Sequence, residues 1–228
     1  MRRRLVIAID GPAGVGKSSV GCLVAKRLGY KFINTGEMYR ALTWKAMEED
    51  ADLQDGRVLT GLARRLRWGF ETGPEGVVIR TTLDGRSVSK HIVDERVSRN
   101  TSAIAGVPGV RKHLRMLQRR LGRDGGIVME GRDIATNVFP DAELKIYLDA
   151  SIDERASRRT RQLRSQGHKV RLCDIRQAIA ERDRHDLQRR INPLRQAKDA
   201  VVVDSTSLTL QAVAGRILRL VKARRGRP

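Results

Sequence analysis

Residues 11–18 of the chain read Gly11-Pro12-Ala13-Gly14-Val15-Gly16-Lys17-Ser18, which matches the pattern GxxxxGK[ST] at every defined position. The apolar run Leu5–Ile9 precedes this stretch and a helical pattern over Ser18–Leu28 follows it. In that setting the glycine-rich backbone amides and the helix N-terminus point at one anion. The alternative, an ordinary glycine-rich turn, accounts for none of this context. The stretch therefore predicts a site for the phosphates of a nucleoside triphosphate.

Two side chains of this loop have expected roles. Lys17 would reach the β- and γ-phosphates, and the Ser18 hydroxyl would coordinate Mg²⁺. The expected cofactors are therefore ATP, as phosphoryl donor, and Mg²⁺. The loop does not identify the acceptor.

Short apolar runs alternate with amphipathic helical patterns along much of the chain, which predicts an α/β fold of the P-loop NTPase type. Helical periodicity covers Ser18–Leu28 and Val110–Leu121. We expect a central five-stranded parallel sheet flanked by helices. Its strands are predicted at Leu5–Ile9, Lys31–Ile33, Ile127–Met129, Leu144–Leu148 and Ala200–Val203.

Two segments interrupt the alternation. Residues 61–92 hold three strand-like runs, Trp68–Thr72, Val77–Leu83 and Ser87–Ile92, which predict a small antiparallel insertion. Residues 151–171 are rich in arginine and predict a helical hairpin near Gly167 that acts as a mobile lid. The kinase core is then expected to comprise residues 1–60, 93–150 and 172–228.

The composition limits the partners and the compartment. There are 46 Lys and Arg against 26 Asp and Glu, a formal charge of +20, which favours phosphorylated or polyanionic ligands. Aromatic residues make up 4% of the chain and do not interleave with the basic runs, so we expect no dedicated nucleic-acid binding. Cys22 and Cys173 lack metal-binding or redox spacing and are typical of reduced thiols in a cytoplasmic protein. No apolar run is long enough to cross a membrane, and we expect a monomer.

Three further segments carry candidate functional residues. Residues 34–40 and 129–134 follow predicted strands, where an open α/β sheet binds its ligands. In the first, Arg40 would face an acceptor phosphate, although Thr35 also suits a simple helix N-cap. In the second, Glu-Gly-Arg-Asp combines carboxylates with a guanidinium that can grip a phosphate. Residues 181–190 place Arg182, Asp186 and Arg189 on one helix face, which suits a ribose and a phosphate or, alternatively, a solvated stripe of ion pairs.

Taken together, these segments resemble the bacterial cytidylate kinases, in the nucleoside monophosphate kinase group, over nearly the whole chain. The insertion at residues 61–92 resembles the three-stranded piece of the monophosphate-binding region in that family. The segments that carry the resemblance are Ile9-Asp10-Gly11-Pro12, Thr35-Gly36 with Met38-Tyr39-Arg40, Gly131-Arg132-Asp133-Ile134, Val138-Phe139-Pro140-Asp141-Ala142, Lys145-Ile146-Tyr147-Leu148-Asp149-Ala150, Arg182-Asp183 with Asp186, Pro193-Leu194, and Ala200 with Val203-Asp204-Ser205.

The resemblance implies a role for each matching residue. For the acceptor, CMP or dCMP, Ser102, Arg111 and Asp133 would read the cytosine, Arg40, Arg132 and Arg189 would bind the phosphate, and Arg182 and Asp186 would hold the ribose. Thr35 and Tyr39 are also expected at the acceptor. For ATP, the residues are Gly11 to Gly16, Lys17, Ser18, Ser19 and Arg158. Lys17, Arg132, Arg155 and Arg159 are the expected catalytic residues, the last two together with Arg158 meeting the triphosphate from the lid.

The chain departs from the family pattern at two positions, where Ala135 replaces a usual glycine and Thr35 a frequent serine. Two rival functions remain open. One is another small P-loop kinase, acting on adenylate or shikimate, which should lack both the insertion and the Gly-Arg-Asp segment. The other is a basic nucleic-acid-binding NTPase, which predicts salt-dependent binding to strands and ATP turnover without a small acceptor.

Overall fold

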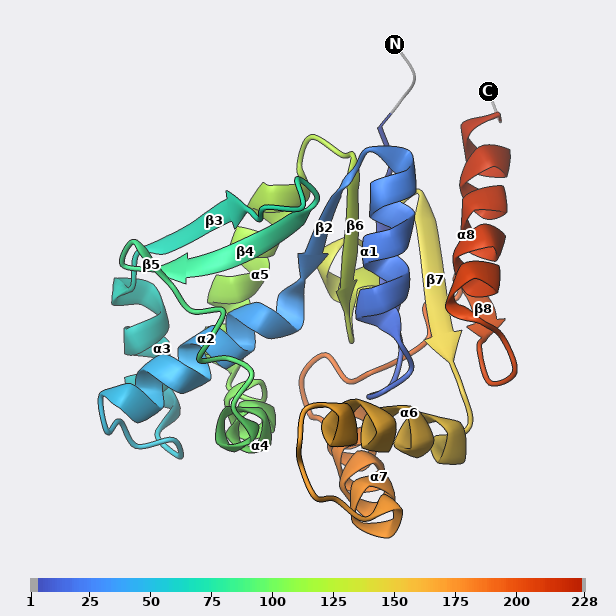
Figure 1. Cartoon of the computed structure of the whole chain (residues 1–228). Helices are drawn as coiled ribbons and strands as arrows, with labels where there is room; N and C mark the ends of the chain where they lie inside the picture. The colour runs from blue at the N-terminus through green and yellow to red at the C-terminus, as the bar shows by residue number, and fades with distance from the viewer. Residues whose placement is uncertain (1–3, 227–228) are drawn as a thin grey trace.

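The structure is a computed structural model that describes residues 4–226, so the predicted core's ends at residues 1–3 and 227–228 lie outside the described residues. A mixed sheet runs through the molecule with helices packed around it (Figure 1). The strands are β1 (Val6–Asp10), β2 (Lys31–Asn34), β3 (Trp68–Thr72), β4 (Val78–Leu83), β5 (Arg86–Ser87), β6 (Ile127–Gly131), β7 (Leu144–Asp149) and β8 (Val201–Asp204). The helices are α1 (Lys17–Leu28), α2 (Thr35–Glu48), α3 (Gly56–Arg65), α4 (Glu95–Ile104), α5 (Pro108–Gly122), α6 (Ile152–Ser165), α7 (Leu172–Gln188) and α8 (Leu210–Arg225), with a π-helical turn η1 (Ile134–Val138).

The predicted core of five parallel strands is confirmed, in the order β2-β6-β1-β7-β8. Successive side chains of β1 pack into two different hydrophobic clusters, one on each face of the sheet. Ile7 and Ile9 pack in a cluster with residues of α1 and α8, whereas Ala8 packs in a cluster that includes η1. Because side chains alternate across a strand and both faces are covered, a continuous apolar run is what such a strand requires.

The insertion extends this sheet. Strand β3 pairs antiparallel with β4, and β4 also pairs parallel with β2 through Phe32 opposite Val78 and Ile33 opposite Ile79. The sheet therefore has eight strands in all, with β3 and β4 continuing it beyond β2. The predicted core–insertion boundary at residue 61 lies inside α3.

The third predicted strand of the insertion, Ser87–Ile92, is wrong beyond its first residue. Strand β5 ends at Ser87, and the chain then turns, with the amides of His91 and Ile92 donating to the carbonyl of Val88 at 2.9 and 3.1 Å. Val88 and Ile92 are both buried. A turn puts residues four apart on the same side, so these apolar residues reach the core without the alternation of a strand.

The helical hairpin predicted near Gly167 is confirmed as α6 and α7, and Gly167 adopts a positive φ of 86° between them, although α7 begins at Leu172, after the predicted segment of residues 151–171. In Figure 1 the arrowheads of β6 and β7 point toward this hairpin, while the described ends of the chain lie at the opposite end of the molecule. The hairpin therefore lies beside the carboxyl ends of the parallel strands, the edge at which this class of sheet binds ligands.

Candidate active site

The phosphate loop connects β1 to α1 and takes a shape that depends on glycine. Gly11 has a φ of 151°, and a Cβ there would lie 2.0 Å from the carbonyl oxygen of Leu148. Gly16 directly precedes α1 with a φ of 94°. Any other residue at position 11 would collide with β7, so the close approach of two backbones explains this glycine.

Lys17 lies inside the loop. Its Nζ donates hydrogen bonds to the carbonyl oxygens of Gly11 at 2.8 Å and Pro12 at 2.6 Å, and the residue is buried. Burial, reinforced by repulsion from Arg132, lowers the pKa of Lys17 to about 7. The ammonium is thus poised to gain a negative partner.

A buried carboxylate that sequence reasoning left without a role lies beside Ser18. The Ser18 hydroxyl donates to Glu130 Oε1 at 2.5 Å, and the Asn34 amide donates to Ser18 Oγ at 3.5 Å. The alternative interpretation of Thr35, as a simple N-cap, is wrong. Asn34 holds the cap position, and Thr35 Oγ1 donates instead to the carbonyl oxygen of Glu130 at 2.7 Å. This bond ties the start of α2 to the end of β6.

Asp186 on α7 joins two of the predicted acceptor residues. Arg132 Nε donates to Asp186 Oδ2 at 2.7 Å, and Arg189 Nη2 donates to Oδ1. Burial raises the pKa of Asp186, but Arg132 and Arg189 outweigh it and hold the pKa below its ordinary value. Asp186 and Arg189 therefore belong to a cluster of ion pairs that is largely shielded from solvent. The alternative interpretation of this helix face, a solvated stripe of ion pairs, is wrong.

Arg40 and Arg182 add two cations whose side chains have no hydrogen-bond partner in the described part of the chain. Arg182 Nε is buried and has no hydrogen-bond partner among residues 4–226. Burial, followed by repulsion from Arg132, lowers the pKa of Arg182 to about 10. Arg40 likewise makes no hydrogen bond within the described chain, and burial lowers its pKa despite the attraction of Glu37. Partly buried cations without hydrogen-bond partners mark a place for an anion.

Two side chains hold the carboxylate of Asp133. Arg111 Nη2 donates to Asp133 Oδ2 at 2.6 Å, and Asn137 Nδ2 donates to the same oxygen at 2.9 Å. The Arg111 guanidinium also lies 5.7 Å from the centroid of the Tyr39 ring. The next turn of the chain is held by Asp10, which accepts the amides of Ile134 and Ala135. Three of the predicted acceptor residues, 39, 111 and 133, are thus brought together.

Ser102 and Ser19 are not tied into these contacts. Ser102 lies partly buried in α4 and Ser19 is exposed in α1. Neither side chain makes a hydrogen bond to another residue in the described part of the chain. The structure therefore adds no contact in support of either predicted role.

The lid arginines differ from one another in what they contact. Arg155 is buried and holds Asp183 and the carbonyl oxygens of Ala13 and Ala150, while Arg158 donates to the carbonyl oxygen of Ser205 at 2.6 Å and to Glu154 at 2.8 Å. To meet a triphosphate as expected, either guanidinium would have to exchange these partners. Arg159 makes a longer contact, 3.4 Å to Glu95 on α4, and so lies between the hairpin and the acceptor side.

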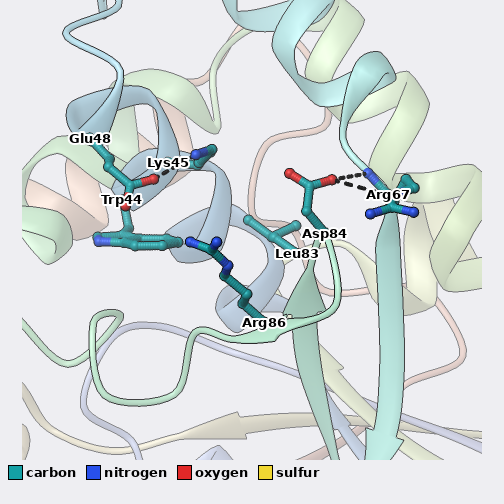
Figure 2. A pocket seen from close by; sticks show the side chains of 7 residues that line it. All are labelled: Trp44, Lys45, Glu48, Arg67, Leu83, Asp84 and Arg86. Atoms are coloured by element: carbon teal, nitrogen blue, oxygen red, sulfur yellow. Dashed lines mark hydrogen bonds and ion pairs between the residues drawn. The ribbon is translucent and has the colours of Figure 1, made fainter.

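A cavity of about 340 Å³ lies between α2 and the β4–β5 hairpin. Figure 2 shows the side chains that line it. The Trp44 indole lines this cavity and also stacks on His91, with ring centroids 4.5 Å apart. Lys45 is paired with Glu48 at its rim, and Arg67 lies near Asp84. None of the predicted site residues lines this cavity.

Residues 4–226 contain no cluster of three or more His, Cys, Asp or Glu able to hold a metal ion. None of their helices combines the length and apolar character needed to cross a membrane. At the end of the phosphate loop, the Ser18 hydroxyl and the Glu130 carboxylate form a hard-ligand pair that suits Mg²⁺ when phosphate oxygens and water complete the shell.

Residues 7–223 match the protein family described as cytidylate kinase. The chain belongs to that family. It is therefore a nucleotide-binding kinase, a transferase, and the resemblance inferred from the sequence is confirmed.

Members of the cytidylate kinase family with similar sequences fall into two groups by length. The chain is 44% identical over 98% of the length of "Cytidylate kinase" from Bacillus velezensis and covers 97% of its own length in that match. It is 48% identical to "Bifunctional pantoate ligase/cytidylate kinase" from Synechococcus sp. (strain JA-3-3Ab), of which it spans 41% while 96% of this chain is covered. A solved structure of an uncharacterized protein from Eubacterium ventriosum has a TM-score of 0.53 at 10% identity, covering 97% of this chain and 99% of the other, a likeness of fold alone.

Proposed function

We propose that this cytidylate kinase family member transfers the γ-phosphoryl of ATP to CMP, and also to dCMP, giving CDP or dCDP and ADP. One observation carries the proposal: the phosphate loop and the arginine cluster around Asp186 lie at the same edge of the sheet. The first suits a triphosphate, and the second suits the phosphate of a monophosphate acceptor. The curated relatives named as cytidylate kinases support the choice of acceptor.

The base would be read by Asp133 and Arg111. Cytosine presents an amino group at N4 and acceptors at O2 and N3. A carboxylate and a guanidinium joined at 2.6 Å offer a matching acceptor and donor. Ser102 stays a proposed contributor because α4 leads toward Arg111, which donates to the carbonyl oxygen of Ala105.

The reaction needs positioning more than proton transfer, because the acceptor phosphate is already an anion at neutral pH. Lys17 and the loop amides would neutralise the transferred group, while Arg40, Arg132 and Arg189 align the acceptor for in-line attack. Arg182 with Asp186 would hold the ribose, and Thr35 and Tyr39 would complete that side. Mg²⁺, held at Ser18, would supply charge neutralisation between the phosphates.

The lid, residues 151–171, would close over the triphosphate and exclude water, since an open site would hydrolyse ATP without transfer. Of the lid arginines, Arg159 is the best placed to reach the reacting phosphates. Its contacts to Glu95 and Gln162 are exposed to solvent, so it can exchange them for phosphate oxygens more easily than a buried guanidinium can. Residues 61–92 are proposed as the acceptor-side insertion and 151–171 as the lid. We further propose a cytoplasmic monomer without dedicated nucleic-acid binding.

The decisive experiment measures ADP formation by the purified protein with ATP and Mg²⁺, adding CMP, dCMP, UMP, AMP or shikimate in turn. Turnover that requires CMP or dCMP is the expected result. Equal ADP release without acceptor would favour the nucleic-acid-dependent NTPase, and turnover with AMP or shikimate alone would favour another small kinase. Either result contradicts the proposed acceptor.

A further inference from the structure

The backbone of Ala13, in the middle of the phosphate loop, is held at its N–H and at its carbonyl oxygen by two residues of the α6–α7 hairpin. Its N–H donates to Asp183 Oδ1 at 3.0 Å, and its carbonyl oxygen accepts from Arg155 Nη1 at 3.1 Å. The two side chains are themselves an ion pair through Arg155 Nη1 and Asp183 Oδ2. The Ala13 backbone and the two side chains thus form a closed ring of hydrogen bonds.

This arrangement is buried and anchored. The side chains of Arg155 and Asp183 are 9% and 12% exposed. Arg155 Nε also donates to the carbonyl oxygen of Ala150 at 3.0 Å, which fixes the guanidinium to the end of β7. A Cβ at Gly14 would lie 3.4 Å from Arg155, so the next loop residue packs against the same side chain. Hydrogen bonds in such surroundings hold their geometry well.

Helix α7, which contains Asp183, also contains Asp186, the carboxylate at the centre of the arginine cluster. Asp183 and Asp186 are one turn apart on α7, and Asp186 binds Arg132 and Arg189. A single turn of a rigid helix therefore contacts the donor loop with one carboxylate and the acceptor arginines with the other. The separation between donor and acceptor phosphates decides the rate of in-line transfer.

We infer that Arg155 and Asp183 are positioning residues for the phosphate loop, and that α7 sets the distance between the bound donor and acceptor. The inference rests on the proposed kinase function and assigns a role to Asp183 that neither motif nor family resemblance gave it. It also changes the role of Arg155. The family resemblance implies that this guanidinium contacts the triphosphate. In the structure, Arg155 and Asp183 form a clamp on the Ala13 backbone, and this clamp keeps the guanidinium on Ala13 and Asp183.

The test compares Asp183→Asn, Arg155→Met, Arg155→Lys and the double variant Arg155→Met/Asp183→Asn. Each is assayed for kcat and for KM toward ATP and CMP, and for MgADP binding by calorimetry without acceptor. We expect the single changes to raise KM for ATP and the Kd for MgADP by about tenfold or more. The KM for CMP should change less than KM for ATP, and the double variant should be no worse than the worse single variant, because the two residues act as one unit. Arg155→Lys should restore part of the loss.

The matched control is Asp174→Asn, which removes the partner of Arg171 in an exposed ion pair at the start of the same helix and should change neither constant. If Arg155→Met weakens ATP use but Asp183→Asn does not, Arg155 acts on the triphosphate directly and the clamp is wrong. A lowered melting temperature with unchanged constants in both single variants would show a purely structural pair and also overturn it. If Asp183→Asn does not fold, Arg155→Lys decides: unchanged MgADP affinity counts against the clamp.

Failure of the proposed function is recognised separately. A wild-type protein that forms no ADP with CMP or dCMP contradicts the acceptor assignment. The MgADP affinities of the variants would still test the clamp, because that measurement needs no acceptor.

Discussion

Asp186 binds a different arginine with each of its carboxylate oxygens, Arg132 at 2.7 Å on Oδ2 and Arg189 on Oδ1. The carboxylate is thus the central anion of a cluster. Arg182, whose side chain has no hydrogen-bond partner in the described part of the chain, also lies near it. Removing it leaves buried cations facing one another, a change that costs several kcal/mol in comparable buried pairs.

Asp186→Asn should therefore lower the free energy of unfolding by about 2–4 kcal/mol and raise KM for CMP at least about tenfold. Thermal denaturation with and without CMP or sulfate measures the effect, because an added anion should restore part of the lost stability. Asp174→Asn, on the exposed start of α7, serves as control. Unchanged melting in the absence of anions would contradict the central role of this carboxylate.

Arg182→Gln should have opposite effects on stability and on function. Its pKa, lowered to about 10 by burial and then by Arg132, shows that the folded protein holds this charge at a cost. Without ligand, the substitution should raise the free energy of unfolding by about 1–3 kcal/mol, while KM for CMP rises. Chemical denaturation and steady-state kinetics test both effects. The exposed neighbour Arg184→Gln should alter neither, and a destabilised Arg182→Gln protein would argue against an electrostatic role.

Lys17 should take up a proton when a phosphate anion binds. With a pKa near 7 in the ligand-free site, Lys17 is largely neutral at pH 8 and largely charged at pH 6. A bound phosphate raises the pKa, so MgADP binding at pH 8 should draw in close to one proton. Calorimetry in buffers of different ionisation enthalpy measures this number at each pH. Lys17→Met should abolish the uptake at pH 8 and lower turnover by several orders of magnitude; uptake that persists in the variant would assign it to another group.

Asp133→Ala should chiefly weaken discrimination among bases. Its carboxylate is held by Arg111 and Asn137, so removing it frees both donors and deletes the expected partner of the cytosine amino group. The ratio of kcat/KM for CMP to that for UMP and AMP should fall, whereas KM for ATP should stay near the wild-type value. An unchanged preference for CMP would show that the base is read elsewhere.

The sequence was sufficient for those parts of the molecule that depend on local patterns. Apolar runs predicted all five core strands, because buried parallel strands need side chains for two cores, as Ile7 and Ala8 illustrate. Glycines at fixed spacing predicted the phosphate loop, since Gly11 has no room for a side chain. The strand-end positions of Arg40 and Arg132 likewise predicted a common edge.

Contacts between residues far apart in the sequence could not be predicted from local patterns. Asp183 contacts an amide 170 positions earlier in the chain, and nothing in its immediate neighbourhood distinguishes it from the exposed carboxylates of α7. Val88 and Ile92 suggested a strand because both are apolar, although their burial comes from a turn. The contact between Ser18 and Glu130 joins two motifs that the sequence presented as separate sites.

The parallel pairing of β2 with β4 has a consequence for how the protein folds. A domain joined to the core by flexible linkers could unfold and refold independently. Here, however, Phe32 and Ile33 of β2 are paired directly with strand β4 of the insertion. Opening that segment would expose the edge of β2 and part of the main core, so its local unfolding should be linked to the global transition. Amides of β4 should therefore exchange with solvent deuterium at rates close to those of β2, and the acceptor half should be lost in the same cooperative step as the donor half.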